Sequence, residues 1–343
     1  MPGSTLSPPD LVVLGDCNPD VLVLGDDVTP AFGQQEKLVA SMSLVIGGSA
    51  AITAVAAARL GLRVALVAAV GADPAGRFML DQLASEGVDV AAVAVREDTP
   101  TGMTVALSRG GDRAILTALG AVASLTAADV PGGLLAAARH VHASSYFLLE
   151  DSLGPGLAGV LAAARAAGAR TSLDTNWDPA GRWGDGRLRA ALAQADVLLP
   201  NEAEALLLAG QPGLPGALAV LAAAGPAEVG PAEPGPAVAG PAVVGSAVVV
   251  KRGPRGALCV SGGERWQVSL PPVTAVDATG AGDCFNAGLI AGLLDGLALP
   301  RAAALGCAVG ALSTQAAGGT AGAPGLPAAA ARAQLASVSR AVP

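Results

Sequence analysis

Short apolar runs alternate with alanine-rich stretches along most of this chain. Strand-like runs rich in Val, Leu and Ile are predicted at 11–15, 21–25, 37–46, 63–70, 88–95, 139–147, 170–174, 197–199, 247–251 and 257–260. Helix-like stretches are predicted at 49–60, 74–85, 156–167, 186–195, 202–209, 280–294, 300–316 and 327–339. Repetition of strand then helix is typical of a parallel sheet with helices on both faces. The pattern therefore predicts an α/β fold.

Two more strand-like runs, 102–108 and 113–119, flank the turn sequence Gly110-Gly111-Asp112 and predict a β-hairpin. This hairpin and the early strands do not fit the alternation of strand and helix. We expect them to form a small separate sheet, with strands within about 16–46 and 100–120, that serves as a lid.

Residues 225–245 differ in kind, because Gly-Pro-Ala recurs there with almost no charge and no large side chain. A segment of this composition cannot bury enough apolar surface to offset the entropy of ordering it. We therefore expect an insertion or linker within a single domain that spans residues 1–343.

The charge balance narrows the range of partners. The chain has 20 basic and 28 acidic residues, a net charge of −8, and no basic cluster, which argues against nucleic-acid or anionic-membrane binding. Its four cysteines lack metal-site spacing, and His140 and His142 alternate on one face of a predicted strand, where a structural role is expected. The uncharged window 38–58 changes pattern midway, and the N-terminus does not resemble a signal peptide. We expect a cytoplasmic protein without a membrane span.

Two glycines and an acid stand where the helix predicted at 280–294 begins. Gly280 and Gly282 would let backbone N–H groups approach an anion closely, and a helix N-terminus adds unpaired donors and a positive dipole end. Asp283 would then lie beside the anion, kept ionised by the dipole, where it could accept a proton from a hydroxyl attacking a phosphoryl group. The alternative is that Asp283 only complements the helix dipole and the glycines only form a turn.

A second glycine motif, Gly-Pro-Gly-Leu-Ala-Gly at 154–159, matches the dinucleotide-binding pattern, and Asp174 ends the next predicted strand. Glu150 and Asp151 separate this motif from the preceding strand and would repel a pyrophosphate. We therefore disfavour a dehydrogenase. The sequence also has no Walker A loop.

Several motifs together resemble those of the ribokinase-like (PfkB) carbohydrate kinases, from about residue 12 to 323. The matching stretches are 277–283, continued by 285–288; 47–51 with 58–61 and 70–76; Asn201 with Glu204; and Lys251 with Gly253 and Gly256. The resemblance implies a ribokinase-like three-layer α/β sandwich, with a mostly parallel central sheet and a small β-sheet lid. It also implies ATP-dependent phosphorylation of a hydroxyl on a small sugar or sugar acid, with Mg²⁺.

The resemblance also implies roles for individual residues. Asp283 would be the general base, and the backbone of Gly280, Ala281 and Gly282 would form an anion hole. The ATP side would comprise Asn201, Glu204, Lys251, Gly253 and Gly256, with Glu204 holding Mg²⁺ through water. The sugar side would comprise Asn18, Asp20, Gly47 and Gly48, with Arg113 and Asn176 as further candidates.

Some of these assignments stay open. Asn18 and Asp20 could instead be turn and capping residues, and Glu204 a solvated acid in a first helical turn. Asp277 could cap a helix or, with Thr279, belong to a loop that holds K⁺. Ile52 stands where the family usually has an asparagine that can contact the sugar, so ribokinase specificity does not carry over.

Two alternatives to a sugar kinase remain. A nucleoside kinase of the same fold is disfavoured by an aromatic content of 2%, which provides few surfaces for stacking a base. A sugar-sensing binding protein without catalysis is disfavoured by the presence of Asp283 with both glycines. The lid sheet could also mediate a homodimer.

Overall fold

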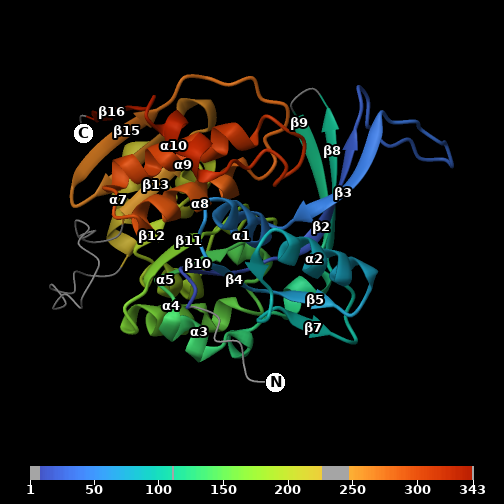
Figure 1. The fold of residues 1–343 in the computed structure, drawn as a ribbon, viewed down its shortest axis with the longest axis horizontal. Helices are drawn as coiled ribbons and strands as arrows, with labels where there is room; N and C mark the ends of the chain where they lie inside the picture. Colours follow the sequence, from blue (N-terminus) through green and yellow to red (C-terminus); the bar gives the residue numbers. More distant parts are fainter. Residues whose placement is uncertain (1–7, 110–111, 226–246, 342–343) are drawn as a thin grey trace.

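The computed structural model describes residues 8–109, 112–225 and 247–341 (Figure 1). Within these ranges the main sheet has ten strands. In spatial order they are β16 (Ser337–Arg340), β15 (Glu264–Ser269), β14 (Ala257–Ser261), β13 (Ala247–Lys251), β12 (Val197–Leu198), β11 (Arg170–Asp174), β10 (His140–Ser144), β1 (Leu11–Leu14), β4 (Val64–Val67) and β6 (Val88–Asp89). Pairing is parallel from β6 across to β13 and antiparallel from β13 to β16.

Helices cover both faces of this sheet. One face carries α3 (Gly132–Ala137), α4 (Gly154–Ala166), α5 (Gly186–Leu192), α6 (Glu202–Ala209) and α7 (Leu214–Ala224). The other carries α1 (Ser49–Arg59), α2 (Pro74–Ser85), α8 (Ala281–Leu294), α9 (Leu299–Ser313) and α10 (Leu326–Ala333). Successive residues of β1 enter different cores, since Val12 and Leu14 face the first helix layer and Leu11 and Val13 the second. The sheet and its two helix layers therefore form a three-layer sandwich.

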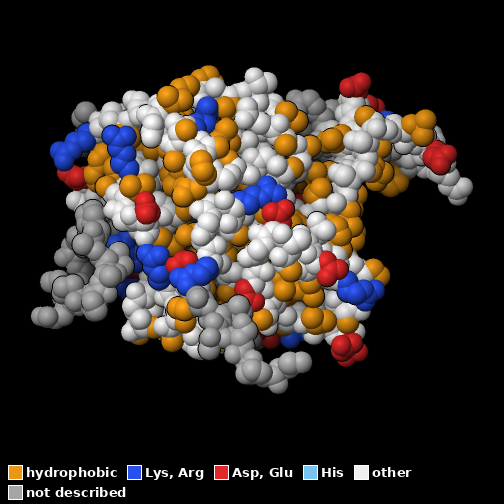
Figure 2. Space-filling model, in the orientation of Figure 1, with side chains coloured by type: hydrophobic (Ala, Val, Ile, Leu, Met, Phe, Trp, Pro, Cys, Tyr) orange, Lys and Arg blue, Asp and Glu red, His pale blue; other side chains and the backbone are white. Residues whose placement is uncertain are grey.

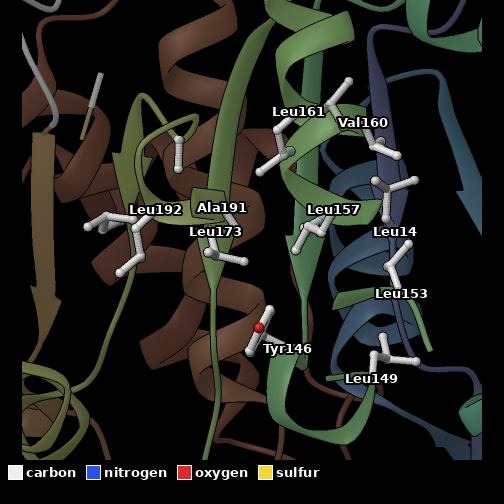
Figure 3. Close-up of a cluster of buried hydrophobic side chains, with 14 of the residues drawn as sticks. Leu14, Tyr146, Leu149, Leu153, Leu157, Val160, Leu161, Leu173, Ala191 and Leu192 are labelled. Carbon is white, nitrogen blue, oxygen red and sulfur yellow. The ribbon is translucent and has the colours of Figure 1, made fainter. Parts of the chain in front are cut away.

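The core under α4 and α5 is made of leucines that pack on the central strands. Figure 3 shows Leu14 of β1 and Leu173 of β11 among side chains from α4, α5 and the turn before α4. Burial of these side chains stabilises the fold by about 1.5–3 kcal/mol each. This layer holds the carboxyl ends of β10 and β11 in place.

Helices α8 and α9 approach each other closely because glycines face the contact. A Cβ on Gly288 would lie 2.9 Å from the Cα of Gly306, and a Cβ on Gly306 would lie 2.8 Å from the carbonyl oxygen of Phe285. No residue larger than glycine fits at either position unless the backbone is displaced. The position of α8, and of Asp283 in its first turn, is therefore set by tight packing.

A separate four-stranded sheet projects from one side of the body (Figure 1). Its order is β3 (Ser41–Gly47), β2 (Asn18–Leu24), β8 (Met103–Arg109) and β9 (Asp112–Ala118). The β2–β3 and β8–β9 pairs are antiparallel, as the hairpin prediction requires, whereas β2 and β8 run parallel. We call these four strands the small sheet. A further pair, β5 (Ala69–Gly71) with β7 (Ala94–Arg96), lies beside it.

Several predicted strands have different bounds in the structure. The run 63–70 is divided into β4 and β5, and 88–95 into β6 and β7. The run 139–147 ends at Ser144, because Ser145 adopts a left-handed backbone with φ of 58° and a 3₁₀ turn follows. The early strand begins at Asn18, so Asn18 and Asp20 lie within β2 and not in a turn. The prediction at 37–46 also began early, since β3 starts at Ser41.

The prediction of a helix over 327–339 is confirmed as far as Ala333 and is wrong beyond it. Helix α10 ends at Ala333, and Ser337–Arg340 forms strand β16 at the edge of the main sheet, paired with β15. The edge of β15 offers unpaired backbone groups that this segment satisfies. Helices α3 and α7 were not predicted, and most of the Gly-Pro-Ala tract at 225–245 lies outside the described residues.

No single helix in the described ranges is long and apolar enough to cross a membrane. The consecutive helices α6 and α7, bent by 68° relative to each other, meet the criterion together on length and composition alone. The uncharged window 38–58 is divided between β3 and α1.

Candidate active site

The N-terminus of α8 has the local geometry expected of an anion site. Gly280 precedes it with φ of 70°, and a Cβ there would lie 2.8 Å from the Cα of Gly319, so glycine is required. The Cys284 amide starts the helical ladder by donating to the Gly280 carbonyl at 2.8 Å, and the Ala281 amide makes a long bond of 3.3 Å to Ala278. Among the described residues, the amides of Gly282 and Asp283 have no protein acceptor, which leaves two donors available at the helix start.

Asp283 lies in this first turn with only 7% of its surface exposed. Burial raises its pKa well above the usual value for an aspartate, and the nearby Asp174 carboxylate raises it further, while Lys251 opposes the shift. The helix dipole was expected to keep the carboxylate ionised. Burial and a second acid, which the sequence does not show, act in the opposite direction and raise the pKa. A buried carboxylate of raised pKa is a stronger base than an ordinary one.

Lys251 ends β13 and provides a cation next to the helix start. Its ammonium forms an ion pair with Asp174, at the end of β11, and Asn286 Nδ2 donates to Asp174 Oδ2 at 2.7 Å. A Cβ on Gly282 would lie 3.5 Å from Lys251 Nζ, so the ammonium lies close to Gly282. Burial would lower the lysine pKa, but Asp174 and Glu204 raise it above its usual value, so the group is charged.

Asn201 and Glu204 begin α6 as a reciprocal cap. The Glu204 amide donates to Asn201 Oδ1 at 2.9 Å, and the Asn201 amide donates to Glu204 Oε2 at 2.8 Å. Burial, followed by the Asp174 carboxylate, raises the pKa of Glu204 to about 7. Asn201 also forms an isolated parallel bridge with Lys251, so both residues adjoin the lysine cluster.

Gly253 and Gly256 lie in the turn between β13 and β14. Both have positive φ, 54° and 81°, and a Cβ on Gly256 would lie 2.0 Å from the carbonyl oxygen of Val268. These glycines therefore shape the turn that follows Lys251.

Asn18, Asp20 and Gly47 lie together on neighbouring strands of the small sheet. Asn18 Nδ2 donates to Asp20 Oδ1 at 3.2 Å and to Thr104 Oγ1 at 3.1 Å. A Cβ on Gly47 would lie 1.9 Å from Asp20 Oδ1, so glycine leaves room for this carboxylate. Gly48 has φ of 85° and lies against the backbone of Asp16.

Asn176 and Arg113 are the two further sugar candidates. Asn176 follows β11, where its Oδ1 accepts from the Ser145 amide at 2.8 Å and its Nδ2 donates to Ser49 Oγ at 2.9 Å. Arg113 lies on β9 opposite Ser108, and its side chain lies outside the described part of the structure.

Two further residues of this region make contacts that the sequence does not show. Asp16 accepts from the amides of Ser49 and Ala50, both at 3.0 Å, and so caps α1 from a distant part of the chain. Ser49, in the first turn of α1, accepts through its Oγ from Asn176 Nδ2 at 2.9 Å. Both contacts depend on tertiary structure, so local pattern could not have found them.

Comparisons with known proteins identify the family of this chain. The model of the pfkB family carbohydrate kinases matches residues 9–326. The chain belongs to this family. It is 29% identical over 313 residues to a fructokinase of Salmonella typhimurium, covering 88% of this chain and 95% of the relative. It is 30% identical over 297 residues to a 2-dehydro-3-deoxygluconokinase of Bacillus subtilis, covering 83% and 86%.

Solved structures agree with this assignment. An E. coli structure described as a ribokinase II with ATP and Mg²⁺ has a TM-score of 0.78 and 26% identity, over 96% of this chain and 99% of that one. The predicted ribokinase-like fold and carbohydrate kinase family are therefore confirmed.

The segment 277–279 of this pfkB kinase is closed by hydrogen bonds. Asp277 Oδ1 accepts from the amide and hydroxyl of Thr279 at 2.9 and 2.7 Å, and Oδ2 accepts from the Gly318 amide at 2.8 Å. These bonds tie the segment to the loop after α9. Potassium binding at Asp277 and Thr279 stays a prediction. Ile52 lies in the core against Gly280 and Gly319.

The competing motif at 154–159 has a structural role in the kinase. Its residues start α4, and a Cβ on Gly156 would lie 2.4 Å from the Cβ of Ala127, so this glycine permits close packing. No strand leads directly into it, which agrees with rejection of a dehydrogenase. His140 and His142 are buried and both hydrogen bond to Ser172 Oγ at 2.8 Å. The described residues contain no group of three or more acids, histidines or cysteines that could hold a metal.

Proposed function

We propose that this kinase transfers the γ-phosphoryl group of ATP to a hydroxyl on a small sugar or sugar acid, with Asp283 as general base and the Gly280–Gly282 backbone as anion hole. The observation that supports this most directly is that a proton acceptor and anion-binding donors lie together at the start of α8. A buried carboxylate of raised pKa adjoins amides that have no protein acceptor among the described residues. Positioning and charge stabilisation are what phosphoryl transfer requires of a protein.

Each part of the cluster has a task in this reaction. Asp283 accepts the hydroxyl proton as the oxygen attacks phosphorus, late in a loose transition state. The amides at the helix start donate to the phosphoryl oxygens as charge develops there. The ammonium of Lys251 adds positive charge beside Gly282. These donors hold the transferred group in line with the attacking hydroxyl.

When bound, ATP would supply the phosphoryl group and Mg²⁺ would neutralise part of its charge. Glu204 would hold this metal through water, since it is a buried carboxylate with Asp174 and Lys251 near it. Mg²⁺ favours such sites, since it dehydrates reluctantly. Asn201, with Gly253 and Gly256, would shape the nucleotide side.

The sugar would bind between the small sheet and α8. Asn18 and Asp20 are short polar groups already oriented by Thr104 and by each other, as a site for adjacent hydroxyls requires. Gly47 and Gly48 would allow backbone to approach the sugar, and Arg113 on β9 is a further candidate for contact with it. Relatives named fructokinase, ribokinase and 2-dehydro-3-deoxygluconokinase make hexoses, pentoses and sugar acids the first substrates to test.

A nucleoside kinase is the second candidate, and one observation favours it. Trp177 directly follows Asn176, is 57% exposed, and packs edge-on against Trp183 with ring centroids 4.8 Å apart. An exposed, supported indole is a surface on which a base could stack.

The deciding experiment is an ADP-release screen over pentoses, hexoses, ketodeoxy sugar acids and nucleosides, with Mg²⁺ or EDTA and with K⁺ or Na⁺. We expect turnover of a sugar or sugar acid that requires Mg²⁺ and is lost in Asp283→Asn. Selective turnover of a nucleoside would support the second candidate. Sugar binding by calorimetry without any ADP release would indicate a sensing protein and contradict the proposal.

A further inference from the structure

Asp174, at the end of β11, is a completely buried carboxylate, with 0% of its surface exposed. Burial of such a group is costly unless its oxygens have partners. Its Oδ2 forms the ion pair with Lys251 and accepts from Asn286 Nδ2 at 2.7 Å, and its Oδ1 accepts from the Asn176 amide at 3.3 Å. Partners from β13, from α8 and from the segment after β11 therefore converge on one side chain.

Asn286 joins the aspartate to the lysine. It follows Asp283 by three residues on α8 and is also 0% exposed. A carboxylate can only accept and an ammonium can only donate, so the Asn286 NH₂ group must face Asp174 and its carbonyl oxygen must face Lys251. Asn286 Oδ1 is 3.5 Å from Lys251 Nζ, as this orientation requires. We call Asp174, Asn286 and Lys251 the lysine triad, in which every contact is between a donor and an acceptor.

The lysine triad restricts a side chain that is flexible by nature. A free lysine samples many rotamers, and its ammonium can rotate to any acceptor. Here the Lys251 side chain is only 13% exposed, and its ammonium lies close to Gly282. Among the described residues, Asp174 and Asn286 accept two of its three N–H donors, which leaves one donor for a ligand. The two bonds to the triad set the direction of that third donor.

We propose that Asp174 and Asn286 are positioning residues for Lys251, and that they hold its ammonium at the start of α8 so that the third N–H donates to the phosphoryl group in transfer. This inference rests on the proposed function, since it takes the start of α8 as the place where that group binds. Positive charge that is fixed before the reaction stabilises the charge developing on the phosphoryl oxygens without any rearrangement. Asp174 and Asn286 act through the lysine and do not touch the substrate.

The test is a double-mutant cycle on kcat for the best substrate of the screen. Asp174→Asn should lower kcat about tenfold and change the KM for the sugar by less than about twofold, because the lost interaction belongs to the transition state. Lys251→Met should lower kcat about 10²-fold. Adding Asp174→Asn to Lys251→Met should change kcat by less than about twofold, since the group that Asp174 positions is then absent. The double variant removes both charges, so neither is left buried without a partner.

Asn286→Ala tests the same role without a change of charge. It should lower kcat about threefold in the wild-type background and have no further effect when Lys251 is absent. Thermal unfolding shows which variants are folded. If Lys251→Met alone does not fold, because Asp174 is left unpaired, the double variant Asp174→Asn/Lys251→Met is the background for Asn286→Ala.

Asp178→Asn is the matched control. Asp178 is a buried carboxylate four residues after Asp174, and it accepts from the amides of Ala180 and Trp183 at 2.8 and 2.6 Å. In the part of the chain that the structure describes, it forms no ion pair with a lysine. Its effect on kcat should be the same with and without Lys251.

The outcomes separate this inference from the proposed function. If Asp174→Asn lowers kcat by the same factor with and without Lys251, it acts through the fold or through its charge on Asp283, and the inference is overturned. Should Asp283→Asn retain activity, the proposed function fails instead. An inactive Asp283→Asn, with independent effects of Asp174→Asn and Lys251→Met, defeats this inference alone.

Discussion

The region around α8 and the small sheet provide the two halves of the proposed site in opposite ways. Residues 283–294 of α8 are buried, and the helix is held against α9 by glycine contacts below 3 Å for any added Cβ. The small sheet has large apolar side chains in solvent, among them Met42 (63% exposed) and Leu116 (64%). Figure 2 shows apolar side chains along this projecting part of the surface.

The difference separates two requirements of a kinase. A base and an anion hole need fixed geometry and low water content, which dense packing supplies. A sugar must enter and leave, and strands with one exposed face can move or associate without disturbing the main core. We therefore expect substitutions near α8 to change the chemical step or the fold, and substitutions on the small sheet to change binding or assembly.

The largest effect is expected at Asp283. Asp283→Asn should lower kcat by about 10²–10⁴-fold with little change in the KM for ATP, because it removes the proton acceptor. On the small sheet, Asn18→Ala should act mainly by raising the KM for the sugar. The measurement is steady-state kinetics on both substrates. Near-normal turnover in Asp283→Asn would contradict this difference between the two regions, since the chemical step would then not depend on the buried start of α8.

The next effect concerns the packing that positions the base. Gly306→Val should destabilise the fold by about 3 kcal/mol, because its side chain would meet the Phe285 carbonyl and ring. Gly159→Ala is the matched control on α4, where no atom lies within 4 Å of an added Cβ, and it should stabilise by about 0.5–1 kcal/mol. Urea unfolding of both variants measures the difference. If Gly306→Val and Gly159→Ala have equal free energies of unfolding, the α8–α9 contact accommodates a larger side chain and the packing argument is wrong.

Features set by neighbours in the chain were predictable. Helix α2 occupies the predicted range 74–85 because Asp73 caps it, Pro74 opens it and Gly87 follows its end. The β8–β9 hairpin likewise follows from its turn residues. The motifs at 47–51, 58–61, 70–76, 201–204, 251–256 and 277–288, taken together in this order, were sufficient to predict the family and the fold.

Features set by tertiary contacts were not predictable. Strand β16 depends on the free edge of β15, so its own residues gave a helical pattern instead. The raised pKa of Asp283 could not be predicted, because burial and the Asp174 carboxylate are tertiary effects, whereas the helix dipole is a local property. The contacts of Asp16 and Ser49 could not be predicted from the sequence for the same reason, since each joins segments far apart in the chain.

A smaller effect is expected in the pH dependence of stability. The folded-state pKa of Glu204 is about 7, above its ordinary 4.5, so the folded protein binds this proton more tightly than the unfolded chain. Its stability contribution is greatest below the unfolded pKa and is lost as pH rises toward 7. Glu204→Gln should therefore raise Tm by about 3 °C at pH 8 and leave it nearly unchanged at pH 5.

Glu202→Gln is the control for this measurement. Glu202 lies two residues earlier in α6 and forms more exposed ion pairs with Arg252 and Arg255. Its replacement should not raise Tm at either pH. A Glu204→Gln variant that loses stability at pH 8 would show that the carboxylate is favourably ionised there and would contradict the assigned direction.

The smallest effect on the folded monomer is expected on the small sheet. Leu44 on β3 and Leu116 on β9 are exposed, so Leu44→Ser and Leu116→Ser should each change stability by less than about 0.5 kcal/mol. We propose that this sheet forms a homodimer, in which case the same variants should raise the dissociation constant of the dimer. Analytical ultracentrifugation over a concentration series measures this directly. A wild-type protein that stays monomeric at high concentration would contradict the dimer proposal. The small sheet would then differ from α8 only in giving the sugar access to the site.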